Sequence, residues 1–218
     1  MERKFNWPRI TLAFLIAVFL FAFGLLAGYV AKEYIQGASL TLEETARNEI
    51  IELETIYLLD SQFQCNTEAL DITSSKLDNL GELITTLEQK KGKNDQEVLG
   101  LKKIYTVLET RHYLLISQRN KQCAQKYSVF FYFYSNGEKC YTPTKEISTI
   151  LAYIRNKYDF VRVYSFDIDL NSDIIDFLKK KYGADSCVTV VLDEQKINFT
   201  PANAAELEAY LLKSRNNL

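Results

Sequence analysis

The stretch FFYFYSNGEKCYTPTKEISTIL, residues 130–151, decides the fold of the C-terminal half of the chain. Its five leading aromatic residues predict a central strand that is buried on both faces. A binding surface made of the same rings is the alternative interpretation. A polar loop with Cys140 follows the strand, and residues 144–158 have the apolar spacing of a helix. The single cysteine at the start of this helix is the feature that a functional interpretation must explain.

Strands and helices alternate from this stretch to the C-terminus. The apolar patterns and turn residues predict the order β-α-β-α-β-β-α over residues 127–218. The two strands on either side of the first helix should be parallel and joined by a right-handed crossover. A closing hairpin at residues 193–196 makes the predicted sheet mixed. The predicted elements are strand 128–135, helix 144–158, strand 160–169, helix 171–183, hairpin 187–199 and helix 204–212.

At these residues the chain resembles the thioredoxin-like family, particularly its membrane-anchored members. The resemblance covers about 90 residues, 127–218. It rests on the element order, on the cysteine loop after the first strand, and on YGADSCVTVVLDEQK, residues 182–196. The family carries a Cys-x-x-Cys dithiol where this chain has Cys140-Tyr141-Thr142-Pro143, and a cis-proline where it has Val188. The resemblance therefore implies a thioredoxin-like α/β fold with a degenerate active site.

The same resemblance implies a partner for Cys140. In the thioredoxin-like fold, the residue before the cis-proline position lies against the first cysteine of the loop, and here that residue is Cys187. A disulfide between them requires Cα atoms about 4.4 to 6.8 Å apart. A stable bridge would lock the domain in a non-catalytic state. If the pair is instead redox-active, Cys140 and Cys187 are the catalytic residues, with Cys187 as the resolving thiol.

The N-terminus carries a membrane-spanning signal. Residues 10–31 contain no charge, and 22 residues of helix are roughly 33 Å long, which is enough to cross the hydrocarbon core. Arg3, Lys4 and Arg9 favour a cytoplasmic tail at residues 1–9. We therefore predict a single-pass protein of the cell membrane whose C-terminal domain is extracytoplasmic. A cleavable signal peptide is the rival interpretation, but its apolar core is normally shorter. A buried core helix is disfavoured because no polar face is present.

Residues 40–123 contain no proline and are predicted to be helical. Three apolar stripes with spacings of three and four indicate an antiparallel hairpin or coiled-coil stalk that turns near Gly92. The first stripe belongs either to a separate helix or to a direct continuation of the second. The stripes are Leu42, Ala46, Ile50, Leu53 and Tyr57; Leu70, Thr73, Leu77, Leu80, Ile84 and Leu87; and Val98, Leu101, Tyr105, Leu108, His112 and Leu115.

The other two cysteines stand at matched distances from this turn. Cys65 lies 28 residues before Lys93 and Cys123 lies 30 after it, so equal helical rise brings both to the open end of the hairpin. This spacing predicts a Cys65–Cys123 disulfide in an exported chain. Two free buried thiols are the alternative.

The charged residues of the helical region are interpreted as solvated helix faces, Lys102 and Lys103 among them. His112 lies on an apolar stripe, where a packed core residue is expected, and it lacks companions with metal-ligand spacing. No metal or cofactor is predicted from these residues. The sequon at Asn198 is a glycan acceptor only in a host that glycosylates exported chains.

Composition excludes two classes of partner. The net charge of −2 offers no basic surface for nucleic acid, and the eight glycines form no phosphate-binding loop for a nucleotide. The predicted partners are the lipid bilayer and an unidentified protein. Three functions remain open: a non-catalytic binding module, a thiol-disulfide oxidoreductase that uses Cys140, and a structural subunit that assembles through its helical hairpin.

Overall fold

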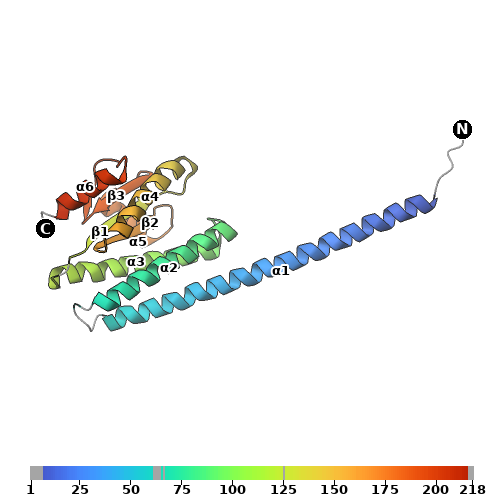
Figure 1. Cartoon of the computed structure of the whole chain (residues 1–218), viewed down its shortest axis with the longest axis horizontal. Helices are drawn as coiled ribbons and strands as arrows, with labels where there is room; N and C mark the ends of the chain where they lie inside the picture. Colours follow the sequence, from blue (N-terminus) through green and yellow to red (C-terminus); the bar gives the residue numbers. More distant parts are fainter. Residues whose placement is uncertain (1–6, 61–64, 66, 125, 216–218) are drawn as a thin grey trace. The chain divides into compact units, whose positions relative to one another are not determined.

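The computed structural model describes residues 7–60, 65, 67–124 and 126–215 (Figure 1). The chain divides into two compact units, Met1–Thr45 and Ala46–Leu218, which are described separately. The elements are α1 (Trp7–Asp60), α2 (Thr67–Lys91), α3 (Gln96–Gln122), β1 (Ser128–Tyr134), η1 (Glu138–Cys140), α4 (Tyr141–Lys157), β2 (Val161–Asp167), α5 (Asp173–Tyr182), β3 (Val188–Leu192), β4 (Gln195–Lys196) and α6 (Ala204–Arg215).

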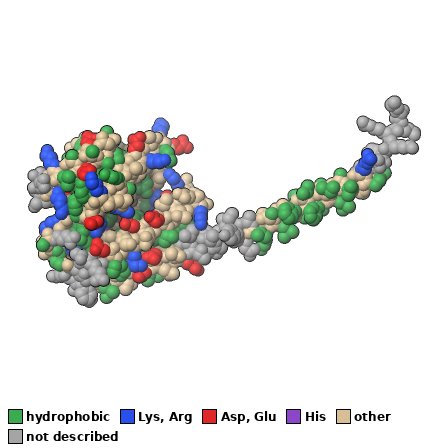
Figure 2. Space-filling model, viewed as in Figure 1, with side chains coloured by type: hydrophobic (Ala, Val, Ile, Leu, Met, Phe, Trp, Pro, Cys, Tyr) green, Lys and Arg blue, Asp and Glu red, His purple; other side chains and the backbone are tan. Residues whose placement is uncertain are grey.

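The first unit contains the apolar part of α1. Among the described residues, one helical segment, Trp7–Val30, is long and apolar enough to cross a membrane, with a mean hydropathy of 2.8. It overlaps the predicted span at 10–31. Its described side chains are exposed, including Trp7 and Tyr29 near its two ends, and Figure 2 shows hydrophobic groups along it. Aromatic residues at both ends suit the two interfaces of a bilayer.

The second unit begins with the last turns of α1 and continues through α2 and α3. Figure 1 shows α2 and α3 side by side, and residues 92–95 connect them. Gly92 has φ +97°, a conformation that favours glycine. Asp95 then caps α3 by accepting hydrogen bonds from the backbone N–H groups of Glu97 and Val98. The stripe positions of α2 predicted from the sequence, Leu70, Thr73, Leu77, Leu80, Ile84 and Leu87, are all buried.

Helix α1 contributes to the same unit. Ala46, Ile50 and Leu53 are buried on one side of it. Lys76 of α2 forms ion pairs with two carboxylates of α1, at 3.0 Å to Glu49 and 2.7 Å to Glu52. The sequence left open whether this segment runs directly into α2. In the structure α1 ends at Asp60 and α2 begins at Thr67.

The four strands form a mixed sheet in the order β2-β1-β3-β4. Strands β1 and β2 are parallel and are joined through α4, whereas β3 pairs antiparallel with both β1 and β4. The turn between β3 and β4 consists of Asp193 and Glu194, both at positive φ, as a tight two-residue hairpin requires. Strand β4 is two residues long, shorter than the sequence pattern indicated. The element order is the predicted one.

Helices cover both faces of the sheet. The aromatic run of β1 alternates between them: Phe131 and Phe133 pack in the core beside α3 and α5, while Phe130 and Tyr132 pack in the core beside α4 and α6. β1 is therefore a central strand buried on both faces, and its rings stabilise both cores. Burying one such side chain contributes roughly 1.5–3 kcal/mol.

Candidate functional site

The structure joins Cys140 to Cys187 by a disulfide, with 5.1 Å between the Cα atoms. Cys140 is the last residue of η1 and the N-cap residue of α4, so that helix begins three residues earlier than the sequence pattern indicated. Cys187 directly precedes β3. Its carbonyl accepts a hydrogen bond from the backbone N–H of Ser135 at 3.0 Å, which ties it to the end of β1. Both cysteines are half-buried.

The second bridge joins Cys65 to Cys123, with 5.7 Å between their Cα atoms. Cys65 lies just before α2, and Cys123 is the C-cap of α3. The structure therefore brings the four cysteines together in the two pairs that the sequence analysis named. Because the chain has four cysteines in all, neither bridge has a spare thiol beside it.

The loop that carries Cys140 is held by hydrogen bonds to the end of β2. The Asp169 carboxylate accepts from the Ser135 hydroxyl at 2.8 Å and from the backbone N–H of Asn136 at 2.7 Å. The Asn136 amide donates to Asp167 at 2.6 Å. Thr144 of α4 donates to the Ser135 carbonyl at 3.2 Å. The loop is thus positioned from both sides, which fixes the approach of Cys140 to Cys187.

Asp167 also forms a buried ion pair that the sequence analysis missed. Lys102 of α3 lies 2.5 Å from Asp167 and 2.9 Å from Glu88, and it is only 7% exposed, so its assignment to a solvated face was wrong. Burial lowers the pKa of the Lys102 ammonium, but the two carboxylates outweigh burial and hold that pKa above its usual value. Lys103, the next residue, is exposed as expected.

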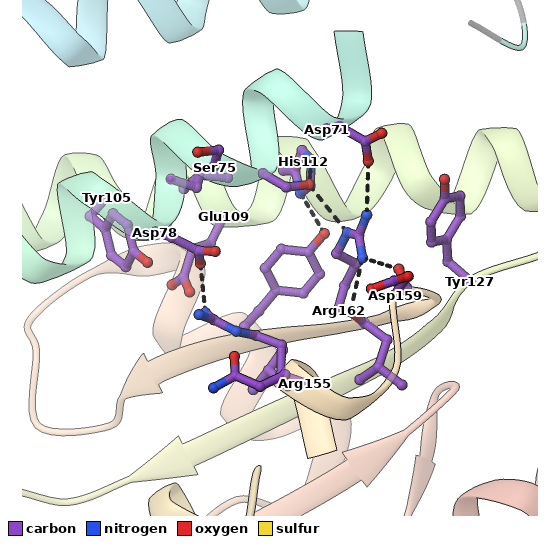
Figure 3. A pocket seen from close by; sticks show the side chains of 16 residues that line it. Asp71, Ser75, Asp78, Tyr105, Glu109, His112, Tyr127, Arg155, Asp159 and Arg162 are labelled. Atoms are coloured by element: carbon purple, nitrogen blue, oxygen red, sulfur yellow. Dashed lines mark hydrogen bonds and ion pairs between the residues drawn. The ribbon is translucent and has the colours of Figure 1, made fainter. Parts of the chain in front are cut away.

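A cavity of 590 Å³ lies in the same unit, bounded by α2, α3, β2 and the end of α4 (Figure 3). Most polar groups around it are paired. Arg155 contacts Asp78 at 2.6 Å. Arg162 donates to the Ser74 hydroxyl at 3.2 Å and to the Asp159 carbonyl at 2.6 Å. A second cavity of 530 Å³ shares part of this lining, so the Asp78–Arg155 pair contributes to both.

His112 is buried at the inner wall of this cavity, with 1% exposure. Its Nδ1 lies 2.7 Å from the Tyr164 hydroxyl, and its Nε2 lies 3.3 Å from the Ser74 hydroxyl. Burial lowers the pKa of His112 to about 3, and the nearby Arg162 and Arg119 guanidiniums act in the same direction. His112 is therefore a neutral, hydrogen-bonded core residue at ordinary pH.

Glu109 lies one helical turn before His112 and is 2% exposed. Its Oε1 accepts a hydrogen bond from the backbone N–H of Ser165 at 2.8 Å. Its Oε2 is buried and has no hydrogen-bond partner within the part of the chain that the structure describes. Burial raises the pKa of Glu109 well above its usual range, and the Asp78 carboxylate acts in the same direction. The Ser165 N–H and the Tyr105 hydroxyl oppose this rise.

The sequence carried a signal for both missed residues. Lys102 follows Val98 by four positions, and Glu109 follows Tyr105 by four and precedes His112 by three. Both therefore stand beside the apolar stripe of α3 rather than opposite it. The apolar stripe predicts contact with one neighbouring helix, but α3 packs against helices on one side and against the sheet on the other. Its buried face is correspondingly wider.

Comparison with known proteins adds a weak likeness. No protein-family model matches the chain, and no curated protein matches it. Among solved structures, the reduced thioredoxin pre-protein of Schistosoma mansoni is similar to 45% of this chain and 88% of its own length, at 20% sequence identity and a TM-score of 0.32. A TM-score this low does not establish a shared fold.

Proposed function

We propose that the chain is a membrane-anchored, extracytoplasmic thioredoxin-like module that binds a partner protein and is not itself catalytic. The observation that carries this proposal is the Cys140–Cys187 bridge, which joins the start of α4 to the start of β3 in a chain without a spare thiol. In the family that the sequence resembles, this is the surface where a dithiol would meet its substrate. A permanent bridge there leaves a rigid surface for binding.

Several features support the membrane anchor and the compartment. The segment Trp7–Val30 is long and apolar enough to cross a membrane, and basic residues precede it. Two disulfides in one chain suit an oxidising compartment outside the cytoplasm. These features favour a cytoplasmic N-terminus with the sheet on the opposite side of the membrane.

A second candidate function, thiol-disulfide oxidoreductase, is favoured by the position of Cys140. A helix N-terminus favours negative charge, and Cys140 caps the 17-residue helix α4, so its thiolate would be stabilised after reduction. In that reaction a substrate dithiol is oxidised to a disulfide, and its two electrons reduce the Cys140–Cys187 bridge to two thiols. The half-buried sulfurs would also be within reach of a thiolate.

The reduction potential of this bridge separates the two functions. For the non-catalytic module we expect the Cys140–Cys187 potential to lie below about −300 mV, as structural disulfides do. The full chain is equilibrated in thiol redox buffers, its free thiols are alkylated, and peptide mass spectrometry reports each cysteine pair separately. A potential between about −270 and −120 mV would support the oxidoreductase instead. The Cys65–Cys123 pair provides the internal reference.

The proposed topology predicts the result of a protease-accessibility experiment. Protease added outside intact cells should digest residues beyond the apolar segment, because they lie on the outer face of the membrane in this topology. A reporter fused to the N-terminus should stay protected until the membrane is permeabilised, and this provides the control. Protection of the C-terminal unit in intact cells would contradict the topology and with it the proposed compartment.

A further inference from the structure

We propose that the cavity between α2, α3 and β2 binds an organic cation with N–H donors, such as a primary ammonium or an amidinium group, and that Glu109 receives it. The cavity has a volume of 590 Å³, which is in the range of small-molecule sites. This site is separate from the Cys140–Cys187 bridge and does not depend on the function proposed above.

One carboxyl oxygen of Glu109 is buried without a hydrogen bond of normal geometry in the described structure. Glu109 lines the cavity, and Figure 3 shows its side chain near those of Asp78 and Tyr105. Oε1 is occupied by the Ser165 N–H. Oε2 makes no hydrogen bond of normal geometry among the residues that the structure describes, although the neighbouring Tyr105 hydroxyl acts to lower the pKa of the carboxyl. A buried polar atom without a hydrogen bond destabilises the fold, and more so if it is charged. A ligand N–H group would remove that destabilisation.

The charges that line the cavity favour a cationic ligand. The lining contains more carboxyl groups than guanidinium groups: those of Asp71, Asp78, Glu109 and Asp159 against those of Arg155 and Arg162. Both arginines are already engaged, Arg155 by Asp78 and Arg162 by several oxygen acceptors. An anionic ligand would therefore meet excess negative charge and no free guanidinium. A cation would be attracted by the carboxyls and by the rings of Tyr105 and Tyr164, which also line the cavity.

A partly exposed ion pair offers a ligand access to the cavity. The Asp78–Arg155 pair lines the cavity, and its side chains are 44% and 39% exposed. A partly exposed ion pair contributes little to stability and rearranges easily. A ligand cation could reach the interior past this pair, whereas Glu109, held by Ser165, would stay in place.

Binding a cation at Glu109 should release a proton. Burial raises the pKa of Glu109, so its carboxyl stays protonated at pH values where an exposed glutamate is ionised. A bound cation favours the ionised carboxylate instead. Affinity should therefore rise with pH, by at most about tenfold per unit, over the range in which the unliganded Glu109 is protonated. Ionisable groups with electrostatic influence in this region come from every neighbouring element: Tyr57 of α1, Asp78 of α2, Tyr105 and His112 of α3, Tyr134 of β1, Arg162 and Tyr164 of β2, and Arg155 of α4.

Three probes of the same shape test the proposal. Benzamidine is a cation with N–H donors, benzamide is its neutral analogue, and benzoate is its anionic analogue. Their binding to the full chain in detergent micelles is measured by calorimetry and saturation-transfer NMR. We expect benzamidine to bind with a dissociation constant in the millimolar range or below, at least about tenfold more tightly than the other two, because it alone supplies a charge-assisted hydrogen bond.

Matched variants assign the binding to Glu109. Glu109→Gln should weaken benzamidine binding at least about tenfold while its amide oxygen still accepts from Ser165. Glu97→Gln on the same helix, at an exposed position, should leave affinity unchanged. If Glu109→Gln does not fold, proton release by the unaltered chain, measured by calorimetry in two buffers, still decides the matter. Equal binding of benzamide, unchanged affinity in Glu109→Gln, no proton release, or no benzamidine binding at millimolar concentration would each overturn the proposal.

Discussion

Replacing Cys65 and Cys123 together with alanine should lower the free energy of unfolding by up to about 4 kcal/mol. The bridge closes a loop with a sequence separation of 58 residues, and the chain-entropy model gives about 4 kcal/mol for a loop of that length. Measured losses are often smaller, because the reduced chain retains some structure. Urea unfolding of the variant and of the unaltered chain, both under oxidising conditions, measures the difference.

The places where backbone amides lose protection from hydrogen exchange provide a sharper test of this bridge. The bridge fastens the beginning of α2 to the end of α3, whereas residues 92–95 fasten their other ends. Amide exchange should therefore accelerate most near Leu70 and Ile116, which are buried next to the bridged ends, and least near Leu87 and Val98. A variant that unfolds at the same urea concentration as the parent, with exchange unchanged near Leu70, would show that packing alone holds these ends together.

The equal arms around the Gly92 turn explain why this bridge could be predicted from the sequence. Helical rise is constant, so counting residues from a turn places two cysteines at the same height. The Cys140–Cys187 pair had no such local signal and followed only from the resemblance to a family. Apolar runs, helical stripes and turn residues predicted the element order, because helices and strands bury side chains with different periods.

Lys102 and Glu109 mark where prediction from the sequence failed. A periodic pattern reports which face of a helix is buried, but it does not report how many neighbours the helix will have. α3 contacts both α2 and β2, so charged side chains beside the stripe became enclosed. They persist there because Lys102 pairs with Asp167 and Glu88, and Glu109 accepts from a backbone N–H of the edge strand β2. Such partners come from distant segments that no local pattern identifies.

The imidazole of His112 should make the fold sensitive to acid. Its pKa is about 3 in the folded chain and about 6.5 in the unfolded chain. Between these values the unfolded state binds a proton that the folded state excludes, so stability falls as pH decreases. The fall is at most 1.36 kcal/mol per pH unit, or about 5 kcal/mol from pH 6.5 to pH 3. Below about pH 3 both states are protonated and the effect ends.

The hydrogen bonds around His112 explain why the folded chain rejects this proton. The Ser74 hydroxyl donates to the Leu70 carbonyl at 2.8 Å and can therefore accept from the N–H at Nε2. The other ring nitrogen, Nδ1, then accepts from the Tyr164 hydroxyl at 2.7 Å. A proton added at Nδ1 would face that hydroxyl and force it to reorient inside the core. Burial and the nearby Arg162 guanidinium oppose the added charge as well.

A His112→Gln variant isolates this contribution from the carboxyl groups of the cavity. Asp78 and Glu109 have raised pKa values, so their contributions to stability are lost as pH rises, which is the opposite direction. Urea unfolding of both proteins from pH 7 to pH 4 should show the variant losing less stability than the parent below pH 6.5. Because His112 is the chain's one histidine, its ring protons can also be followed directly by NMR. In the folded chain the ring protons should show no titration between pH 8 and pH 5. A titration midpoint near pH 6.5, or parallel stability curves for the two proteins, would contradict the prediction. Either result would mean that the imidazole is open to solvent and that the network around it does not exclude the proton.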